Sequence, residues 1–303
     1  MENILSYFYN INNITIQAKK DYYLFFYHGN KYLFFKIERD SKEIVIINDI
    51  LKLFDRKYYS FIYNIQKSII TVVDNDRYVL IKVNSNLPRN LKEVIIKEQF
   101  PIPNNFIGSI DHSNWVYLWS RKNDYYDYQR KHIKNKYYIL YSSINYYIGM
   151  AETAIAFLVN NQTNGNAPKY LSHIRITHNI DDYYNPLNLI IDYKSRDIAE
   201  YLKMIFLNED NYKEISDYIM DNISLTNTEY TLLMARLIYP SIYFDKYDEI
   251  VSNKAKEREI IKIISLTNRY LDFIKYIYSK IQLKNNIPSI DWLRNWYFLL
   301  LWQ

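Results

Sequence analysis

The chain has 303 residues, of which 49% are hydrophobic and 23% charged, so it can bury a core and is not a disordered polymer. This length predicts about two domains, or two lobes of one fold. With no cysteine, the chain cannot hold a disulfide, a cysteine-based zinc site, an iron–sulfur cluster or a thiol nucleophile. Lysines and arginines number 38 against 33 acidic residues. The sequence has no long run of like charges of the kind that would indicate a nucleic-acid partner.

Neither end of the sequence shows a targeting or membrane signal. The first basic residue is Lys19, so the positively charged start of a secretory signal peptide is missing. The apolar stretch 296–302 is seven residues long, whereas a membrane span needs about 20. We therefore expect a soluble protein with no membrane partner.

Residues 1–87 predict a small β-rich lobe. Ser41 is the expected N-cap of one helix, whose apolar residues recur at helical spacing through Phe54. Turn residues at 28–31 and 74–76 predict two hairpins. The expected order is β-β-β-α-β-β, with apolar and β-branched strands at 14–18, 22–27, 32–37, 69–73 and 78–83.

Residues 88–109 hold three of the seven prolines and predict a linker between lobes. From 110 to 303 the pattern is helical, and the apolar run 137–159 predicts a buried central helix. A cleft loop at 171–197 interrupts the helices. Further helices are expected at about 195–207, 210–222, 226–238, 252–281 and 289–301. The sequence thus predicts an α+β fold with a small β-rich N-terminal lobe and a large helical C-terminal lobe.

This layout is typical of protein kinases and of the aminoglycoside-phosphotransferase-like proteins, and the cleft loop carries part of their pattern. These enzymes place His-x-Asp-x-x-x-x-Asn before a β-turn and an Ile-Asp-Trp or Asp-Phe-Gly. The first Asp is the base, while the Asn and the later Asp hold Mg²⁺. Here His173-Ile-Arg175 stands at the first position and Ile190-Ile-Asp192-Tyr at the second. His173, Arg175 and Asp192 are therefore the candidate catalytic-site residues.

Five longer stretches between about 110 and 293 carry a more specific resemblance. They are Trp115-Val-Tyr-Leu-Trp119, Tyr146-Tyr-Ile-Gly-Met-Ala-Glu-Thr-Ala-Ile155, Asp192-Tyr-Lys-Ser-Arg-Asp-Ile-Ala-Glu200, Ala235-Arg-Leu-Ile-Tyr-Pro-Ser-Ile-Tyr-Phe244 and Pro288-Ser-Ile-Asp-Trp-Leu293. In them the chain resembles the CotS/YutH-type spore coat proteins, a kinase-like branch of the aminoglycoside phosphotransferase (APH) superfamily, and the YutH type most of all. The resemblance implies a two-lobed protein-kinase-like fold and a role in sporulation. It also implies other spore coat proteins as partners, and the mother-cell cytoplasm and spore coat as locations.

Departures from the family pattern indicate that phosphoryl transfer has been lost. Arg175 replaces the catalytic Asp, and a guanidinium stays protonated with no lone pair to act as a base. Ile180 stands where the metal-binding Asn would fall, with Asn179 one residue away. No Gly-rich loop is present to cradle phosphates, because Gly29 is alone in its hairpin.

Three charged residues have expected roles outside this pattern. Lys36 and Glu43 could form the Lys–Glu pair that helps to bind a nucleotide in kinases, with ordinary surface charge as the favoured alternative. Asp197 matches the Asp of the superfamily's Asp-Leu-Ala helix start. That match implies a buried structural carboxylate bonded to backbone N–H groups around 172–175.

The cleft residues also predict a specific ion pair. If Arg175 and Asp192 both face the cleft floor, a guanidinium–carboxylate contact between them would replace the metal site. A solvent-facing Arg175 is the alternative. No other metal site is expected, since no Glu-plus-two-His spacing occurs, and no Gly-x-Ser-x-Gly indicates a hydrolase. At the C-terminus, one face of a docking helix is expected from Trp292, Trp296, Leu299 and Leu300.

Together these patterns indicate a spore-coat-associated, kinase-like protein, a pseudokinase with a structural or assembly role and no cofactor. The alternative is an active small-molecule phosphotransferase that uses ATP and Mg²⁺. An RNA-binding module is a third class, because tyrosines and lysines interleave along the chain, although no nucleic-acid partner is expected.

Overall fold

The structure is a computed structural model, and it describes residues 1–19, 22–53, 59–83, 90–97, 100–103, 108–161 and 167–294. The chain divides into two compact units. Unit 1 is Met1–Val94, Asn104–Asp111 and His173–Ile190, and unit 2 is Ile95–Pro103, His112–Ser172 and Ile191–Gln303. The expected cleft loop is therefore divided, with residues 173–190 in the unit that carries the sheet.

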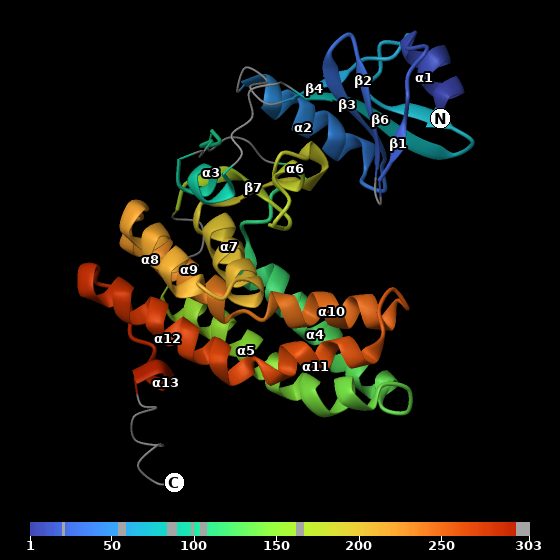
Figure 1. Cartoon of the computed structure of the whole chain (residues 1–303). Helices are drawn as coiled ribbons and strands as arrows, with labels where there is room; N and C mark the ends of the chain where they lie inside the picture. The colour runs from blue at the N-terminus through green and yellow to red at the C-terminus, as the bar shows by residue number, and fades with distance from the viewer. Residues whose placement is uncertain are drawn as a thin grey trace. The chain divides into compact units, whose positions relative to one another are not determined.

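Unit 1 is built on an antiparallel sheet (Figure 1). In the described part of the chain its strand order is β1-β2-β3-β6-β4, with β5 paired to β6. Alternate residues of 59–62, Tyr59 and Phe61, are buried in the core, whereas the central strands bury runs of consecutive residues. The strands are β1 (Gln17–Ala18), β2 (Tyr22–Tyr27), β3 (Asn30–Lys36), β4 (Tyr59–Ile62), β5 (Thr71–Val73) and β6 (Asp76–Val83), of which β4 was not expected from the sequence.

Both predicted hairpins are confirmed, and each turns on two residues. The φ angles of His28 and Gly29 are 47° and 73°, and those of Asp74 and Asn75 are 50° and 69°. Two consecutive positive φ angles give a turn whose twist matches that of the flanking strands. Asn and Asp reach this left-handed region at lower cost than most residues.

Two helices pack with this sheet. The helix α1 (Glu2–Tyr9) was not expected from the sequence, yet its Leu5 is fully buried in one cluster with Phe25 and Phe34 of the sheet. The helix α2 (Ser41–Leu53) was expected, with Ser41 as its cap. The cap is instead Asp40, whose Oδ1 accepts the N–H of Lys42 at 2.8 Å.

The segment expected as a linker carries regular structure of its own. The helix α3 (Leu91–Lys97) lies within it, and the side chains of Val94 and Ile95 are buried. Two prolines there are described, and Pro101 forms an isolated bridge with Tyr170. The third, Pro88, lies outside the described residues. Strands β7 (Lys169–His173) and β8 (Leu189–Tyr193) form a separate two-stranded sheet.

Unit 2 is helical, as predicted. The sequence did not anticipate α10, and it joined α11 and α12, which are separate in the structure. The short helix α6 (Ile180–Tyr183) and the 3₁₀ turn η1 (Pro186–Asn188) belong to unit 1. The helices of unit 2 are α4 (Trp115–Ile133), α5 (Tyr138–Asn160), α7 (Ser195–Asn208), α8 (Tyr212–Asn222), α9 (Asn227–Ile238), α10 (Ser241–Val251), η2 (Glu257–Glu259), α11 (Ile260–Ser265), α12 (Thr267–Lys284) and α13 (Asp291–Arg294).

The most deeply buried helices of unit 2 are α7 and α9, not the expected run 137–159. Every residue of α7 from 195 to 206 and every residue of α9 from 229 to 238 is buried. The helix α5 buries one face and leaves Tyr138 and Tyr146 exposed. Charged residues in α7 and α9 disguise their burial in the sequence, because a hydrophobicity pattern treats each charge as a surface residue.

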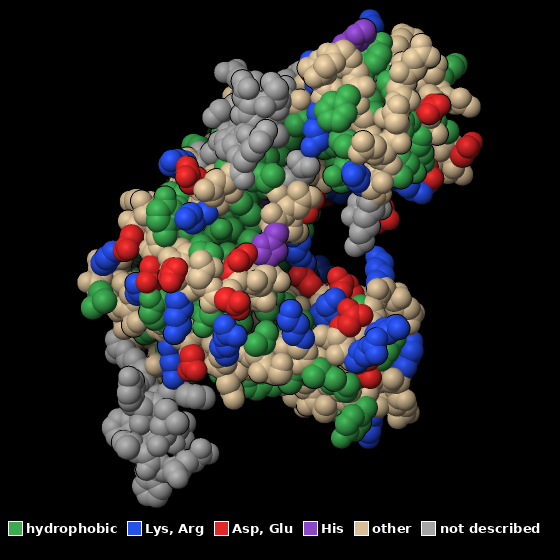
Figure 2. All heavy atoms as spheres, viewed as in Figure 1, with side chains coloured by type: hydrophobic (Ala, Val, Ile, Leu, Met, Phe, Trp, Pro, Cys, Tyr) green, Lys and Arg blue, Asp and Glu red, His purple; other side chains and the backbone are tan. Residues whose placement is uncertain are grey.

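The surface and the C-terminus add two observations. None of the helices in the described residues is both long and apolar enough to cross a bilayer. On the visible face of the helical part, basic and acidic side chains are interspersed (Figure 2). Trp292 is half-buried on α13, whereas Trp296, Leu299 and Leu300 of the expected docking face lie outside the described residues.

Candidate functional site

The cleft loop of unit 1 is held in shape around Arg175 by one asparagine. Asn188 Oδ1 accepts the N–H of Arg175 at 3.0 Å, and Asn188 Nδ2 donates to the carbonyls of Arg175 at 2.7 Å and Asp182 at 3.2 Å. The exposed guanidinium of Arg175 donates to the carbonyl of Ile174 at 2.8 Å. The ring of His173 is buried, with its centroid 4.0 Å from that of Tyr183. This arrangement places a permanent cation, not a base, at the expected catalytic position.

The asparagine nearest the expected metal position is also engaged within the loop. Asn179 Nδ2 lies 3.3 Å from Asp182 Oδ1, and Thr177 Oγ1 donates to Asp182 Oδ2 at 2.6 Å. Ile180 begins the short helix α6. Local hydrogen bonds of this kind stabilise a turn, as such side chains commonly do.

Lys36 and Glu43, considered from the sequence as a possible kinase-like pair, each have a different partner, and for Lys36 the favoured alternative of ordinary surface charge agrees with the structure. Lys36 Nζ lies 2.7 Å from Asp76 Oδ2, and both side chains are about half exposed. Glu43 instead pairs with Arg39 at 2.9 Å, and Arg39 Nη1 donates to the carbonyls of Leu187 and Leu189 at 2.8 Å each. Glu43 therefore orients Arg39, which holds the end of the cleft loop. The sequence analysis assigned no role to Arg39.

In unit 2 the carboxylate of Asp192 is completely buried. Its Oδ2 accepts from Arg196 Nη1 at 2.7 Å, and its Oδ1 accepts the N–H of Tyr193 at 2.7 Å. Burial raises the pKa of Asp192, and the guanidinium groups of Arg196 and Arg236 oppose that rise. Within unit 2 the partner of Asp192 is thus Arg196, four residues further along the chain, whereas the predicted pairing with Arg175, a residue of unit 1, stays a prediction.

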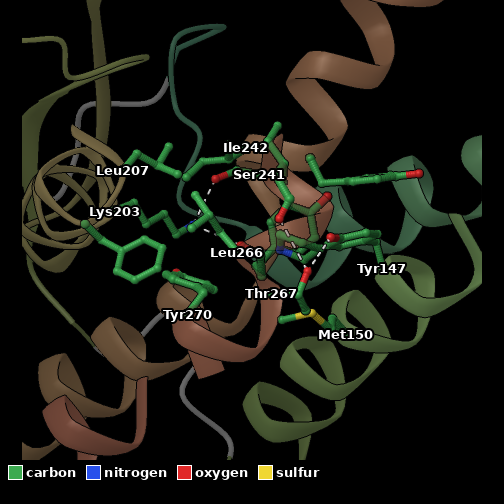
Figure 3. Close-up of a pocket in the computed structure, with 14 residues that line it drawn as sticks. Tyr147, Met150, Lys203, Leu207, Ser241, Ile242, Leu266, Thr267 and Tyr270 are labelled. Carbon is green, nitrogen blue, oxygen red and sulfur yellow. Dashed lines mark hydrogen bonds between the residues drawn. The ribbon is translucent and has the colours of Figure 1, made fainter. Parts of the chain in front are cut away.

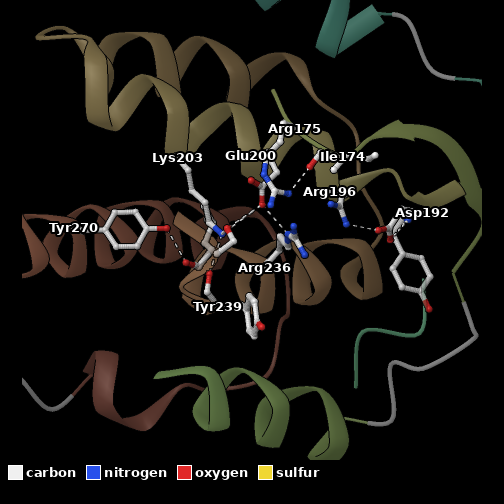
Figure 4. Close-up of polar contacts among 12 residues, drawn as sticks. Ile174, Arg175, Asp192, Arg196, Glu200, Lys203, Arg236, Tyr239 and Tyr270 are labelled. Atoms are coloured by element: carbon white, nitrogen blue, oxygen red, sulfur yellow. Dashed lines mark hydrogen bonds and ion pairs between the residues drawn. The ribbon is translucent and has the colours of Figure 1, made fainter. Parts of the chain in front are cut away.

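Arg196 opens a row of buried charges along one face of α7 (Figure 4). Residues 196, 200 and 203 are spaced by four and three, which places them on one side of a helix. Glu200 Oε1 accepts from Arg236 Nε of α9 at 2.7 Å, and Lys203 Nζ lies 3.5 Å from the same oxygen. Lys203 also donates to the carbonyl of Tyr239 at 2.9 Å. We refer to Asp192, Arg196, Glu200, Lys203 and Arg236 as the buried charge cluster.

Aromatic rings of α4 cover one side of this cluster. The guanidinium carbon of Arg236 lies 5.6 Å from the ring centroid of Trp115 and 5.7 Å from that of Trp119. Trp119 in turn stacks on Tyr239 at 4.2 Å. A guanidinium over an indole face is attracted by the ring quadrupole, so these contacts offset part of the cost of burying Arg236.

Asp197 lies in the first turn of α7 and is 9% exposed, so its predicted burial is confirmed. A carboxylate at this end of a helix is favoured by the helix dipole. Its bonding to backbone groups around 172–175 stays a prediction.

Except for Lys203, the residues that build or cover the cluster fall within the stretches that carried the family resemblance. Trp115 and Trp119 come from the first stretch, Asp192, Arg196 and Glu200 from the third, and Arg236 from the fourth. The sequence analysis quoted these residues and assigned no role to Arg196, Glu200, Lys203 or Arg236. The signal that could have identified the three residues of α7 is the spacing of charges at 196, 200 and 203, which places them on one helical face.

No group of three or more His, Asp or Glu side chains that could hold a metal ion occurs in the described ranges. The donor chemistry around Asp192 points the same way, since each carboxylate oxygen already accepts a short hydrogen bond. The residues at this position therefore do not fit a bound Mg²⁺.

Comparisons with known proteins agree with the resemblance found in the sequence. Residues 2–277 match the family described as "Spore coat putative kinase YutH". The endospore coat-associated protein YutH of Bacillus subtilis (strain 168) is 23% identical over 175 residues, which are 50% of this chain and 51% of that protein. The match thus spans about half the length of this curated relative.

Solved structures with the same fold are aminoglycoside phosphotransferases. The enzyme from Alicyclobacillus acidocaldarius has a TM-score of 0.60 at 9% identity, covering 88% of this chain and 92% of that one. A spectinomycin phosphotransferase in complex with ADP and spectinomycin has a TM-score of 0.52 at 11% identity, covering 93% and 97%. At these identities the likeness concerns the fold alone, and it confirms the predicted kinase-like architecture.

Proposed function

Because this chain belongs to the YutH family of spore coat putative kinases, we propose that it is a pseudokinase. It keeps the phosphotransferase fold without phosphoryl transfer, and it has a structural or assembly role in sporulation. Its partners are other coat proteins, and it requires no nucleotide or metal cofactor. By analogy with the endospore coat-associated relative, the protein is made in the mother-cell cytoplasm and joins the spore coat.

The state of Asp192 is the observation that carries the proposal. In a phosphotransferase this Asp offers its oxygens to Mg²⁺. Here the carboxylate is 0% exposed and is bound by Arg196 and by the N–H of Tyr193, each at 2.7 Å. Releasing it for a metal would break the buried contact with Arg196, and breaking a buried ion pair costs about 3–5 kcal/mol. Metal binding at this position would have to overcome that cost.

Two further features of the chain support the same proposal. Arg175 stands at the position of the base and cannot accept a proton. Lys36 is engaged by Asp76 and Glu43 by Arg39, an arrangement that differs from the Lys–Glu pair of an active kinase.

The alternative is an active small-molecule phosphotransferase that uses ATP and Mg²⁺. It rests on the fold, because a structural neighbour is a phosphotransferase described in complex with ADP. A shared fold supports this alternative weakly, since chemistry resides in specific side chains.

MgATP binding and turnover separate the two. The purified protein should show no saturable MgATP binding and no rise in Tm, whereas a nucleotide present at 100 times its Kd would add about 2.7 kcal/mol to stability. An Arg175→Asp variant restores a carboxylate in the exposed loop and can gain weak Mg²⁺ affinity, but it should remain without turnover. ATP turnover by the parent protein that is lost in Asp192→Asn would contradict the pseudokinase proposal and support the phosphotransferase.

The assembly role has its own test in sporulating cells. A fluorescent fusion should collect at the coat in the parent and equally in Arg175→Asp, because a scaffold does not depend on the cleft loop's chemistry. A fusion that stays diffuse in the mother cell throughout sporulation would contradict the coat assignment.

A further inference from the structure

A cavity within unit 2 is too small for an organic ligand. It lies among α5, α7, α10, α11 and α12, and its volume of about 40 Å³ has room for water molecules only (Figure 3). Lys203, which lines it, already donates to the carbonyl of Tyr239 and to Ser241 Oγ. A partner of unit 2 would therefore bind at the surface of the unit and not in this cavity.

The end of unit 2 at which α4 turns into α5, and α10 into η2, is strongly basic (Figure 1). Residues 130–141 and 252–258 include seven basic residues and one acidic residue, whereas the whole chain has 38 basic and 33 acidic residues. These two segments therefore carry the entire positive excess of the chain. We refer to their seven cations as the basic end: Arg130, Lys131, Lys134, Lys136, Lys254, Lys256 and Arg258.

Hydrogen bonds join the two segments into one surface. The hydroxyl of Tyr137 donates to the carbonyl of Ile250 at 3.2 Å. Glu257 Oε1 accepts the N–H groups of Ile139 at 2.7 Å and Leu140 at 3.1 Å. The acidic residue of the two segments thus caps the start of α5, and the cations of both turns lie at the same end of the unit.

Few carboxylates compensate the charge of this surface. Arg130 pairs with Asp127 at 3.1 Å, while the neighbouring Glu249 and Glu259 both pair with Lys246. In the described part of the chain, the other six members of the basic end form no ion pair, and all six side chains are exposed.

The stability of the helices does not explain this gathering of charge. Lys136 lies just before the start of α5, and Lys256 and Arg258 lie at the start of η2, which α11 follows directly. The N-terminal end of a helix carries a partial positive charge, so cations there are unfavourable. Like charges gathered on one surface also repel one another. An anionic partner would relieve both effects.

Two features favour carboxylates over nucleic acid in that partner. Lys136 Nζ lies 4.8 Å from the ring centroid of Tyr137, and Lys134 Nζ lies 5.8 Å from that of Tyr141. Each lysine thus covers a ring face on which a nucleobase would otherwise stack. Five of the seven cations are lysines, whereas arginine is the residue suited to bidentate recognition of phosphate.

We propose that the basic end binds an acidic segment of a partner protein, a run rich in Asp and Glu. The carboxylates of the segment lie beside the exposed ammonium and guanidinium groups of both turns. The inference rests on the proposed assembly role in one respect, since it takes the partner to be another coat protein. It uses none of the residues at the catalytic positions.

A fluorescently labelled oligoglutamate peptide of ten residues tests the proposal on the full chain, with fluorescence anisotropy as the measurement. Oligoglutamate should bind the parent at least tenfold more tightly than a serine–glycine peptide of the same length. Because salt screens exposed charges, its affinity should fall at least tenfold between about 0.05 and 0.5 M NaCl. Equal affinities for the two peptides would overturn the proposal.

Matched charge variants assign the binding to the basic end. The combined variant Lys134→Gln, Lys136→Gln and Lys256→Gln should weaken oligoglutamate binding at least tenfold. Its Tm should equal or exceed that of the parent, because it relieves repulsion at the surface, so a lost fold would not account for the weaker binding. Unchanged affinity in this variant would overturn the proposal.

The control variant removes three exposed lysines elsewhere in the chain, Lys19→Gln, Lys42→Gln and Lys213→Gln. It has the same net charge as the first variant and should change oligoglutamate affinity by less than twofold. An equal loss in both variants would mean that net charge alone attracts the peptide, which overturns the proposal.

A labelled deca-thymidylate tests nucleic acid as the partner, and it should bind the parent more weakly than oligoglutamate does. Tighter binding of the oligonucleotide that is lost in the first variant would assign the surface to nucleic acid and overturn the proposal.

Fluorescent fusions in sporulating cells separate this inference from the assembly role. The fusion of the first variant should collect at the coat less than that of the control variant. If the parent fusion stays diffuse while the purified protein binds oligoglutamate at the basic end, the assembly role fails and the site for an acidic segment stands. If the parent fusion reaches the coat and the purified protein does not bind oligoglutamate, this inference fails and the assembly role stands.

Discussion

Two ion pairs of equal length illustrate how differently the two units use charge. In unit 1, Lys36 and Asp76 meet at 2.7 Å with side chains 55% and 43% exposed. In unit 2, Arg196 and Asp192 also meet at 2.7 Å, with side chains 6% and 0% exposed. Water screens the first pair, and forming it gains little. The second pair is shielded from water, so removing either partner leaves an uncompensated charge in the core.

The comparison shows that an ion-pair distance alone does not reveal a function. Lys36 was the candidate nucleotide-binding lysine and proves to be a surface residue, whereas Arg196 had no assigned role and is at the centre of a buried network. The buried charge cluster joins β8, α7 and α9 through charged hydrogen bonds that require one relative placement of these elements. In this protein, several residues of the stretches that carry the family resemblance are buried in the core of the helical unit.

The largest expected effect comes from breaking the buried pair. Arg196→Met leaves the Asp192 carboxylate buried without its guanidinium and should lower the free energy of unfolding by about 3–5 kcal/mol. Urea unfolding followed by circular dichroism measures this loss. The matched control is Lys36→Met, which should unfold at the same urea concentration as the parent. Similar midpoints for the two variants would contradict the contrast between the units.

A pH series tests the other end of the cluster. The pKa of Lys203 is about 8 in the folded protein, below the ordinary lysine value of 10.5. Between these values the unfolded chain binds more protons, so stability rises with pH, and the cost is fully present below pH 8. From pH 8 to 10 the parent should gain on the order of 2–3 kcal/mol relative to Lys203→Met. If the difference in unfolding free energy between the two proteins stays constant with pH, the ammonium of Lys203 is solvated and not buried.

The third expected effect concerns Asp197. Asp197→Ala should destabilise the fold by about 1–3 kcal/mol, because a buried carboxylate leaves donors unsatisfied when it is removed. Asp197→Asn keeps acceptor capacity and should cost less. Thermal unfolding of both variants provides the measurement. An Ala variant that melts with the parent would refute the structural role inherited from the superfamily's helix start.

The smallest expected effect lies at the start of α9, which carries Arg236. Thr226 and Glu229 form a capping box, with the Thr226 hydroxyl accepting from the N–H of Glu229 at 3.2 Å and the Glu229 carboxylate accepting the N–H of Thr226 at 2.8 Å. Thr226→Ala should cost about 1 kcal/mol, and Thr226→Ser, the control, close to nothing. A loss as large as that of Arg196→Met would mean that the cap, rather than the charge cluster, positions α9.

Local sequence patterns determined most of the secondary structure and the fold class. The two hairpins follow from residues that tolerate positive φ, and α2, α4, α7, α8 and α9 follow from apolar residues at helical spacing. The loss of a base at the catalytic position also follows from the sequence alone. Arg175 stands where the family has an acid, and no environment gives a guanidinium the lone pair of a base. The family resemblance was also present in the sequence, in stretches whose order along the chain needs no coordinates.

Tertiary structure alone decided which charges are buried and which partners they have. The sequence analysis considered only Arg175 as a partner for Asp192, whereas the start of α7 brings Arg196, four residues further along the chain, onto this carboxylate. Lys36 pairs with Asp76 because the strands β3 and β6 bring the two residues close together. Glu43 pairs with Arg39, which lies just before the start of α2. A periodicity argument treats every charged side chain as solvated. Only the packing of α7 against α9 removes water from one such row, and burial then makes these charges determinants of the fold.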